Sequence, residues 1–129
     1  MTLAKLKLGE LPQIYNALAE LAKEKMPTTA SYKIAKLLKT IEREFAIFEE
    51  QRMKLLDKYA DKDETGKFII TDNKYQFTKN GRERFDAEFE ELSNLEIEVD
   101  FTPIAVNEFE NAQISPIVLA VLDKFVIGF

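Results

Sequence analysis

The segment TTASYKIAKLLKTIEREFAIFEEQRMKLLDKY, residues 28–59, decides the fold of this 129-residue chain. Seven apolar side chains recur in it at alternating steps of four and three residues: Ile34, Leu38, Ile41, Phe45, Phe48, Leu55 and Tyr59. This spacing places them on one face of an α-helix. Arg52 is the one polar residue in the row, and we expect its side chain to reach past the row to water rather than to pair with a buried acid. Because Pro27 stops an earlier helix and Thr28 or Thr29 can cap a new one, the sequence predicts one long amphipathic helix.

Two shorter elements are predicted in front of this helix. Apolar residues with helical spacing, and Pro12 in the first turn, predict a helix over residues 11–22. The break at residues 25–27 is short, and short connections join antiparallel neighbours, so the two helices should form a hairpin. Residues 3–8 alternate apolar residues with lysines, which indicates a short strand that Gly9 ends.

A third helix is predicted to end near Asn94. Its start is either Thr78 or Asn80, and Asn80 with Glu83 three residues later resembles a capping box. Its apolar stripe, spaced i, i+4, i+7, consists of Phe85, Phe89 and Leu92. These residues predict a helix that packs through one side only.

The clearest strand signal is LEIEVDF, residues 95–101, which alternates strictly between apolar and acidic residues. Pro103 ends this strand, and residues 104–114 are predicted to be irregular. Ser115 and Pro116 then start a helix over residues 117–126 that is almost uncharged. We expect this helix either to be buried in the core or to lie against another protein.

These elements predict a predominantly helical α+β fold with an antiparallel helical hairpin, a small antiparallel β element and a short C-terminal helix. With 129 residues, 46% of them hydrophobic and 32% charged, the chain fits a single domain over residues 1–129. Six side chains are expected to be buried together: Phe45, Phe48, Phe85, Phe89, Ile97 and Val99.

Residues 61–72 allow two interpretations. Four oxygen-bearing residues fall at positions 1, 3, 5 and 12 of an EF-hand-like calcium loop: Asp61, Asp63, Thr65 and Asp72. Against a metal site, the aspartate at the last position is short for bidentate binding, and no second helix follows. Residues 67–71 and 74–77 instead favour two strands around an Asp-Asn turn. We therefore expect a helix, a loop and a β-hairpin, with calcium binding as the alternative.

The composition lacks the residues on which most catalysis depends. The chain has no histidine and no cysteine, so it lacks the commonest general base, the commonest transition-metal ligand and any thiolate. Its four glycines are scattered and form no phosphate-binding loop. Neighbouring carboxylates such as Glu49 and Glu50 point in different directions on a helix. We expect a protein that is not an enzyme and has no cofactor, with a small Asp/Glu metal-dependent enzyme as an alternative.

Charge divides the chain. Residues 1–84 carry 17 basic and 13 acidic residues, whereas residues 85–129 carry one basic and 10 acidic residues. The split favours surfaces that meet different protein partners, although an acidic half also serves solubility alone. The candidate acidic surface consists of Glu90, Glu91, Glu96, Glu98 and Asp100. Lys33, Lys36 and Lys39 form a candidate basic surface for an anionic partner, but we favour the simpler interpretation that they serve solubility and pair with Glu42 and with acids of the first helix.

Other partner classes fit the sequence poorly. The net charge of −5 disfavours binding to nucleic acid, since phosphates would be repelled overall. No apolar run has the length of a membrane span, and the N-terminus has no signal-peptide core. The sequence therefore predicts a protein partner or self-assembly without a membrane, and it says nothing about a small-molecule ligand.

The order of these features resembles a family of small uncharacterised proteins of tailed phages and prophages of Gram-positive bacteria. The similarity covers about residues 10–125, including KYADKDETGKF at residues 58–68, and is most specific in the run that ends in LEIEVDFTPI at residues 95–104. The resemblance implies no activity, but it implies the cytoplasm of a bacterial host, or a virion, as the setting. We expect a phage accessory protein that binds a host protein through its acidic half, or alternatively a structural component of the virion or its assembly.

Overall fold

The computed structural model describes residues 2–109 and 112–127. The helices are α1 (Leu11–Leu21), α2 (Thr28–Tyr59), α3 (Lys79–Asn94) and α4 (Pro116–Val121). The strands are β1 (Thr2–Lys7), β2 (Ile70–Thr71), β3 (Lys74–Tyr75), β4 (Glu96–Phe101), β5 (Ile104–Ala105) and β6 (Val126–Ile127). The described residues also form three short 3-10 helices: η1 (Leu8–Glu10), η2 (Val106–Phe109) and η3 (Asp123–Phe125). The predicted helical α+β class is confirmed.

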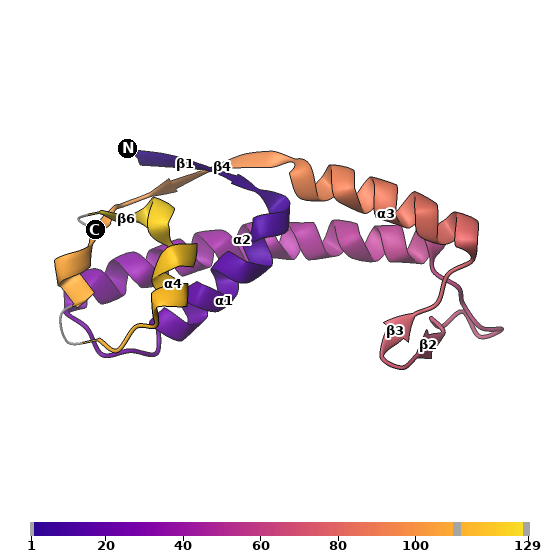
Figure 1. Cartoon of the computed structure of the whole chain (residues 1–129), viewed down its shortest axis with the longest axis horizontal. Coiled ribbons are helices and arrows are strands. Elements are labelled where there is room, and N and C mark those ends of the chain that lie inside the picture. Colours follow the sequence, from indigo (N-terminus) through magenta and orange to yellow (C-terminus); the bar gives the residue numbers. More distant parts are fainter. Residues whose placement is uncertain (1, 110–111, 128–129) are drawn as a thin grey trace.

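The long helix α2 has the predicted length and forms the axis of the molecule. Figure 1 shows α1 against its first half and α3 returning along its second half, with the β2–β3 hairpin at the far end. The β1–β4 ribbon continues from α3 over the first half of α2. No helix within the described residues is both long enough and apolar enough to cross a membrane.

The predicted cap of α2 is wrong, whereas one of the two predicted starts of α3, Thr78, is confirmed. Thr28 is already helical, the cap position is taken by Pro27, and no side chain caps α2. At α3 the Thr78 hydroxyl accepts a hydrogen bond of 3.0 Å from the backbone N–H of Gly81, so Thr78 is the cap and Asn80 lies inside the helix. The capping box at Asn80 is therefore not formed.

The strands form three small sheets. β1 and β4 pair antiparallel over six residues each, so the strand signal in the first residues is confirmed. β2 and β3 form the predicted hairpin, shorter than expected, with Asp72 and Asn73 both at positive φ (52° and 62°). That combination is the backbone of a type I′ turn, which matches the twist of paired strands.

The C-terminal segment differs from the prediction. The helix expected over residues 117–126 ends at Val121, and β5, inside a segment expected to be irregular, pairs in parallel with β6. This pairing places Leu122, Phe125 and Val126 in the core. Pairing with a distant strand thus overrides a local helical pattern.

The core lies where β1, β4, α1, α4 and the first half of α2 meet. Of the six side chains expected to be buried together, Phe48 and Val99 are buried, and three are half-buried against the core: Phe45, Phe89 and Ile97. Phe85 lies outside it and stacks on Phe89 with ring centroids 5.6 Å apart. Because α3 packs mainly on α2 and η1, no described residue of α3 is fully buried.

The side chain of Arg52 does not simply extend to water. It forms an ion pair with Glu49, with 3.1 Å between Arg52 Nη2 and Glu49 Oε2, and both side chains are about two-thirds buried. Its partner is a partly exposed acid one turn earlier in the helix, not a buried acid, since none of the described polar or charged residues is buried.

Candidate protein-interaction surface

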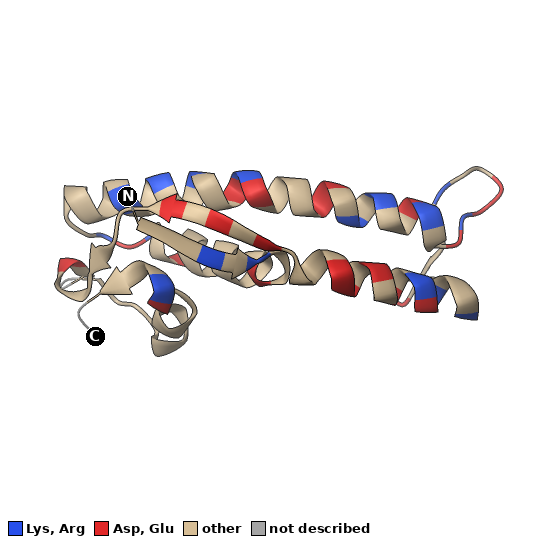
Figure 2. Cartoon of the chain, turned by 90° about the horizontal axis from the view of Figure 1, so that it is seen from above, with Lys and Arg blue, Asp and Glu red and all other residues tan. Residues whose placement is uncertain are grey.

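The acidic residues of β4 share one face, as the alternation predicted. Glu96, Glu98 and Asp100 are exposed, whereas Val99 between them is buried. Figure 2 shows acidic positions recurring along this strand beside α2. The strand therefore offers a row of carboxylates on the side of the sheet away from the core.

The register of β1 gives this face a mixed charge that the sequence did not reveal. Lys5 lies opposite Glu98, and Lys7 lies opposite Glu96, while Leu3 lies opposite Asp100. Opposite charges facing each other across two strands stabilise the pair modestly. The face is thus not wholly acidic, and Asp100 is the carboxylate of the row without a lysine opposite it on β1.

The hydrogen-bond pattern shows which backbone groups of β4 point outward. The N–H of Leu8 donates to the carbonyl of Leu95 (2.9 Å), so these two residues form a hydrogen-bonded pair. In an antiparallel ladder such pairs recur at every second residue, so the residues of β4 that bond to β1 are Ile97, Val99 and Phe101. By this alternation the N–H and C=O groups of Glu96, Glu98 and Asp100 point away from β1. The sheet has two strands in the described part of the chain, so this edge of β4 carries no neighbouring strand.

The outer edge of β1 is partly covered. The ammonium group of Lys124 donates to the carbonyl oxygen of Lys5 at 3.0 Å. The carboxylate of Glu10 accepts a long hydrogen bond of 3.4 Å from the backbone N–H of Lys7. These contacts use one backbone carbonyl and one backbone N–H on the outer edge of β1. On the outer edge of β4, no described hydrogen bond uses the backbone groups of Glu96, Glu98 and Asp100, although Tyr32 and Lys36 of α2 lie beside Asp100.

The basic residues of α2 do not form one surface. Lys33 is turned inward and pairs with Glu108 of η2 at 2.9 Å, while Lys36 and Lys39 are exposed. Lys36 and Asp100 line one small hollow of about 60 Å³ together with Tyr32 and Leu37. The structure thus places part of the predicted basic surface next to the acidic strand, and the predicted pairing of these lysines with Glu42 is absent from the described ion pairs.

The two remaining acidic candidates, Glu90 and Glu91, lie on α3 rather than on the sheet. Both are exposed. Glu91 lines a groove between α2 and α3, opposite two lysines of α2. These two residues therefore belong to a different surface from the acidic row of β4.

The loop after α2 uses its main carboxylate internally. Asp63 Oδ1 accepts hydrogen bonds from the backbone N–H of Thr65 (2.8 Å), its hydroxyl (2.6 Å) and the N–H of Lys67 (3.1 Å). These bonds, with the Thr65 hydroxyl first, lower the pKa of Asp63. Asp72 lies in the hairpin turn, and no three acidic side chains of the described residues gather as metal ligands. The loop therefore forms an Asx-type turn.

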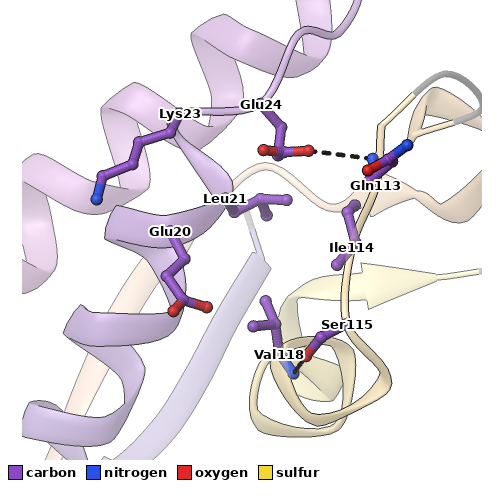
Figure 3. Close-up of a pocket in the computed structure, with 8 residues that line it drawn as sticks. All are labelled: Glu20, Leu21, Lys23, Glu24, Gln113, Ile114, Ser115 and Val118. Carbon is purple, nitrogen blue, oxygen red and sulfur yellow. Dashed lines mark hydrogen bonds between the residues drawn. The ribbon is translucent and has the colours of Figure 1, made fainter.

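A further pocket, which the sequence did not indicate, lies between α1 and the segment before α4. It has a volume of about 300 Å³. Figure 3 shows the Glu24 carboxylate, which accepts a hydrogen bond of 3.1 Å from the backbone N–H of Gln113. Lys23 points away from the pocket, and Ile114 and Val118 lie across it from α1. No local sequence pattern could predict this pocket, because Glu24 and Gln113 are 89 residues apart in the sequence. The hydrogen bond from Gln113 to Glu24 therefore links the segment before α4 to the residues that follow α1.

No protein-family model, curated protein or solved structure matches this chain.

Proposed function

We propose that this protein acts by binding another protein, and that it accepts an extended segment of that partner as a third strand beside β4. The observation that carries the proposal is that the outward backbone groups and the exposed carboxylates belong to the same three residues, Glu96, Glu98 and Asp100. In strand addition the main chain supplies affinity and the alternate side chains supply specificity.

The chemistry of the edge describes the partner segment. Lysine or arginine at every second position would lie beside the carboxylates of β4, as Lys5 and Lys7 do on the other side. The residues of the partner segment that alternate with these basic residues would point to the opposite face of the sheet, toward the hollow lined by Tyr32 and Leu37. Tyr32 is 67% exposed, so an apolar residue there gains contact area. The partner segment is therefore alternately basic and apolar.

The resemblance to proteins of tailed phages adds the setting to this proposal. The partner would be a protein of the bacterial host, in which case the chain is an accessory factor, or a protein of the phage particle, in which case it is an assembly component. Co-purification from infected cells and from purified particles separates the two.

The binding test uses a defined probe. Fluorescent peptides that alternate lysine with valine, and matched peptides that alternate glutamate with valine, are titrated with the protein. The lysine peptide is expected to bind and the glutamate peptide is not. Changing the three acids to Glu96→Gln, Glu98→Gln and Asp100→Asn should weaken binding and flatten its salt dependence, because exposed charges act mainly through long-range attraction.

A second variant distinguishes the contribution of backbone hydrogen bonds to binding from that of the carboxylate charges. Glu98→Pro removes an outward N–H that β1 does not use, so the sheet should remain while strand addition is blocked. The matched control is Glu83→Gln, Asp86→Asn and Glu90→Gln on α3, which removes the same charge from exposed residues outside the sheet. Equal binding of both peptides, or equal loss with the control, would overturn the proposal.

A further inference from the structure

The second half of α2 and the helix α3 form an arm that consists of only two helices (Figure 1). A groove of about 330 Å³ runs along one side of this arm. Leu55, Leu92 and Leu95 contribute its apolar part, and Leu95 is 56% exposed. A pair of helices buries one seam only, so apolar residues beside the seam stay accessible.

The two walls of the groove carry opposite charges. Lys54 and Lys58 stand on the α2 side, and Glu88 and Glu91 stand on the α3 side. Lys58 Nζ lies 3.7 Å from Glu88 Oε1, while Glu88 Oε2 is buried and has no hydrogen-bond partner in the described part of the chain. A surface that is positive along one side and negative along the other is complementary to a second copy of itself.

The levels of these residues along the arm can be compared because α2 and α3 run antiparallel with the same rise per residue (Figure 1). Lys58 is level with Glu88, as their contact shows. Four residues closer to the core, Lys54 is therefore level with the turn of α3 that contains Glu91 and Leu92. Seven residues toward the body, Gln51 is level with Leu95.

Two symmetric arrangements of two copies can close the groove. If the two-fold axis is parallel to the helices, α2 of one copy lies against α3 of the other at the same level, so both lysines meet glutamates and the leucines meet in the centre. If the axis is perpendicular to the helices, α2 lies against α2 and α3 lies against α3. Lysines of one copy then face lysines of the other, and glutamates face glutamates. Charge complementarity selects the first arrangement.

We propose that the protein forms a two-fold dimer through this groove, with the two arms parallel and their four helices packed as a bundle. The dimer rests on Lys54, Lys58, Glu88 and Glu91 at the rim and on the leucines inside. It does not depend on strand addition at β4, and its test uses mass rather than peptide binding.

Charge reversal tests the pairing. Light scattering or sedimentation should give twice the mass of the 14.9 kDa chain for the unmodified protein. The double variants Lys54→Glu/Lys58→Glu and Glu88→Lys/Glu91→Lys should each weaken association by about a hundredfold, since like charges would then face each other. Mixing the two variants should restore the dimer, which also shows that both are folded.

The direction of the arms is tested by cross-linking, because the chain has no cysteine of its own. When Gln51→Cys and Leu95→Cys proteins are mixed under oxidising conditions, the parallel arrangement predicts a disulfide between the two different chains. Disulfides within each single variant should be much slower to form, because identical residues lie diagonally across a bundle of this symmetry.

The matched control is Lys23→Glu/Lys25→Glu, which reverses the same charge on exposed residues at the opposite end of α2 and should leave the dimer intact. A monomeric unmodified protein would overturn the proposal. So would a dimer that survives both arm variants, or one that is instead lost with Ile117→Asp on the exposed side of α4, where Ile117 is 75% exposed.

Discussion

Lys33 and Glu108 are 75 residues apart in sequence, yet Lys33 Nζ lies 2.9 Å from Glu108 Oε1 and joins the start of α2 to η2. Lys33 also donates to the carbonyl oxygen of Pro103 at 3.3 Å. The two side chains are only 18% and 24% exposed, and Glu108 Oε2 is buried without a hydrogen-bond partner among residues 2–109 and 112–127. This contact ties the segment after β4 to the central helix.

The pair should be asymmetric in its effect on stability. Lys33→Met leaves the Glu108 carboxylate partly buried without a counter-charge, which is expected to cost about 1–3 kcal/mol in the free energy of unfolding. Glu108→Gln should cost less, because Lys33 keeps the Pro103 carbonyl and can still reach water. Urea unfolding of both variants measures the difference, and equal losses would contradict this view of the contact.

Phe48 and Phe45 should differ although both belong to the apolar row of α2. Phe48 is 2% exposed, so Phe48→Ala is expected to cost about 3–5 kcal/mol of a total stability of about 5–15 kcal/mol. Phe45 is half-buried and packs against Tyr15 with ring centroids 5.3 Å apart, so Phe45→Ala should cost less. Thermal or urea unfolding in which Phe45→Ala is the more destabilising would show that the core is centred elsewhere.

Gly81 should resist replacement by alanine even though it lies in a helix. An added Cβ would stand 3.0 Å from both the Tyr59 carbonyl oxygen and the Thr78 hydroxyl that caps α3. In an open helix Gly→Ala stabilises by about 1 kcal/mol. Here we expect Gly81→Ala to lower the melting temperature, and a rise would mean that the contact between α3 and the end of α2 relaxes without cost.

The hydrogen bond of Thr65 to Asp63 should be visible in the titration of that carboxyl group. The pKa of Asp63 is lowered from 3.8, so its contribution to stability is complete above that value and is lost as the pH falls through the lower, folded-state pKa. Thr65→Val removes the hydroxyl donor and should raise the pKa of Asp63, whereas Thr65→Ser should preserve it. Carbon-detected NMR titration measures the pKa, and identical values in both variants would refute the role of the hydroxyl.

Part of the candidate surface followed from the sequence alone. Strict alternation put Glu96, Glu98 and Asp100 on one face, since neighbouring side chains of a strand point to opposite sides. The neighbours of that face could not be predicted, because the register of β1 depends on which residues of two distant segments share a core. The same holds for Lys33, whose partner Glu108 lies far along the chain.

The sequence by itself determined the elements whose signals are local. The apolar row and Pro27 set the bounds of α2, the Asp-Asn pair set the hairpin turn, and Ser115 with Pro116 set the start of α4. Only the tertiary structure decided where α4 ends, that β5 pairs with β6, and that Leu37 and Leu56 complete the buried side of α2. The reason is physical: caps and turns satisfy hydrogen bonds within a few residues, whereas burial and strand pairing depend on segments that meet only when the chain has folded.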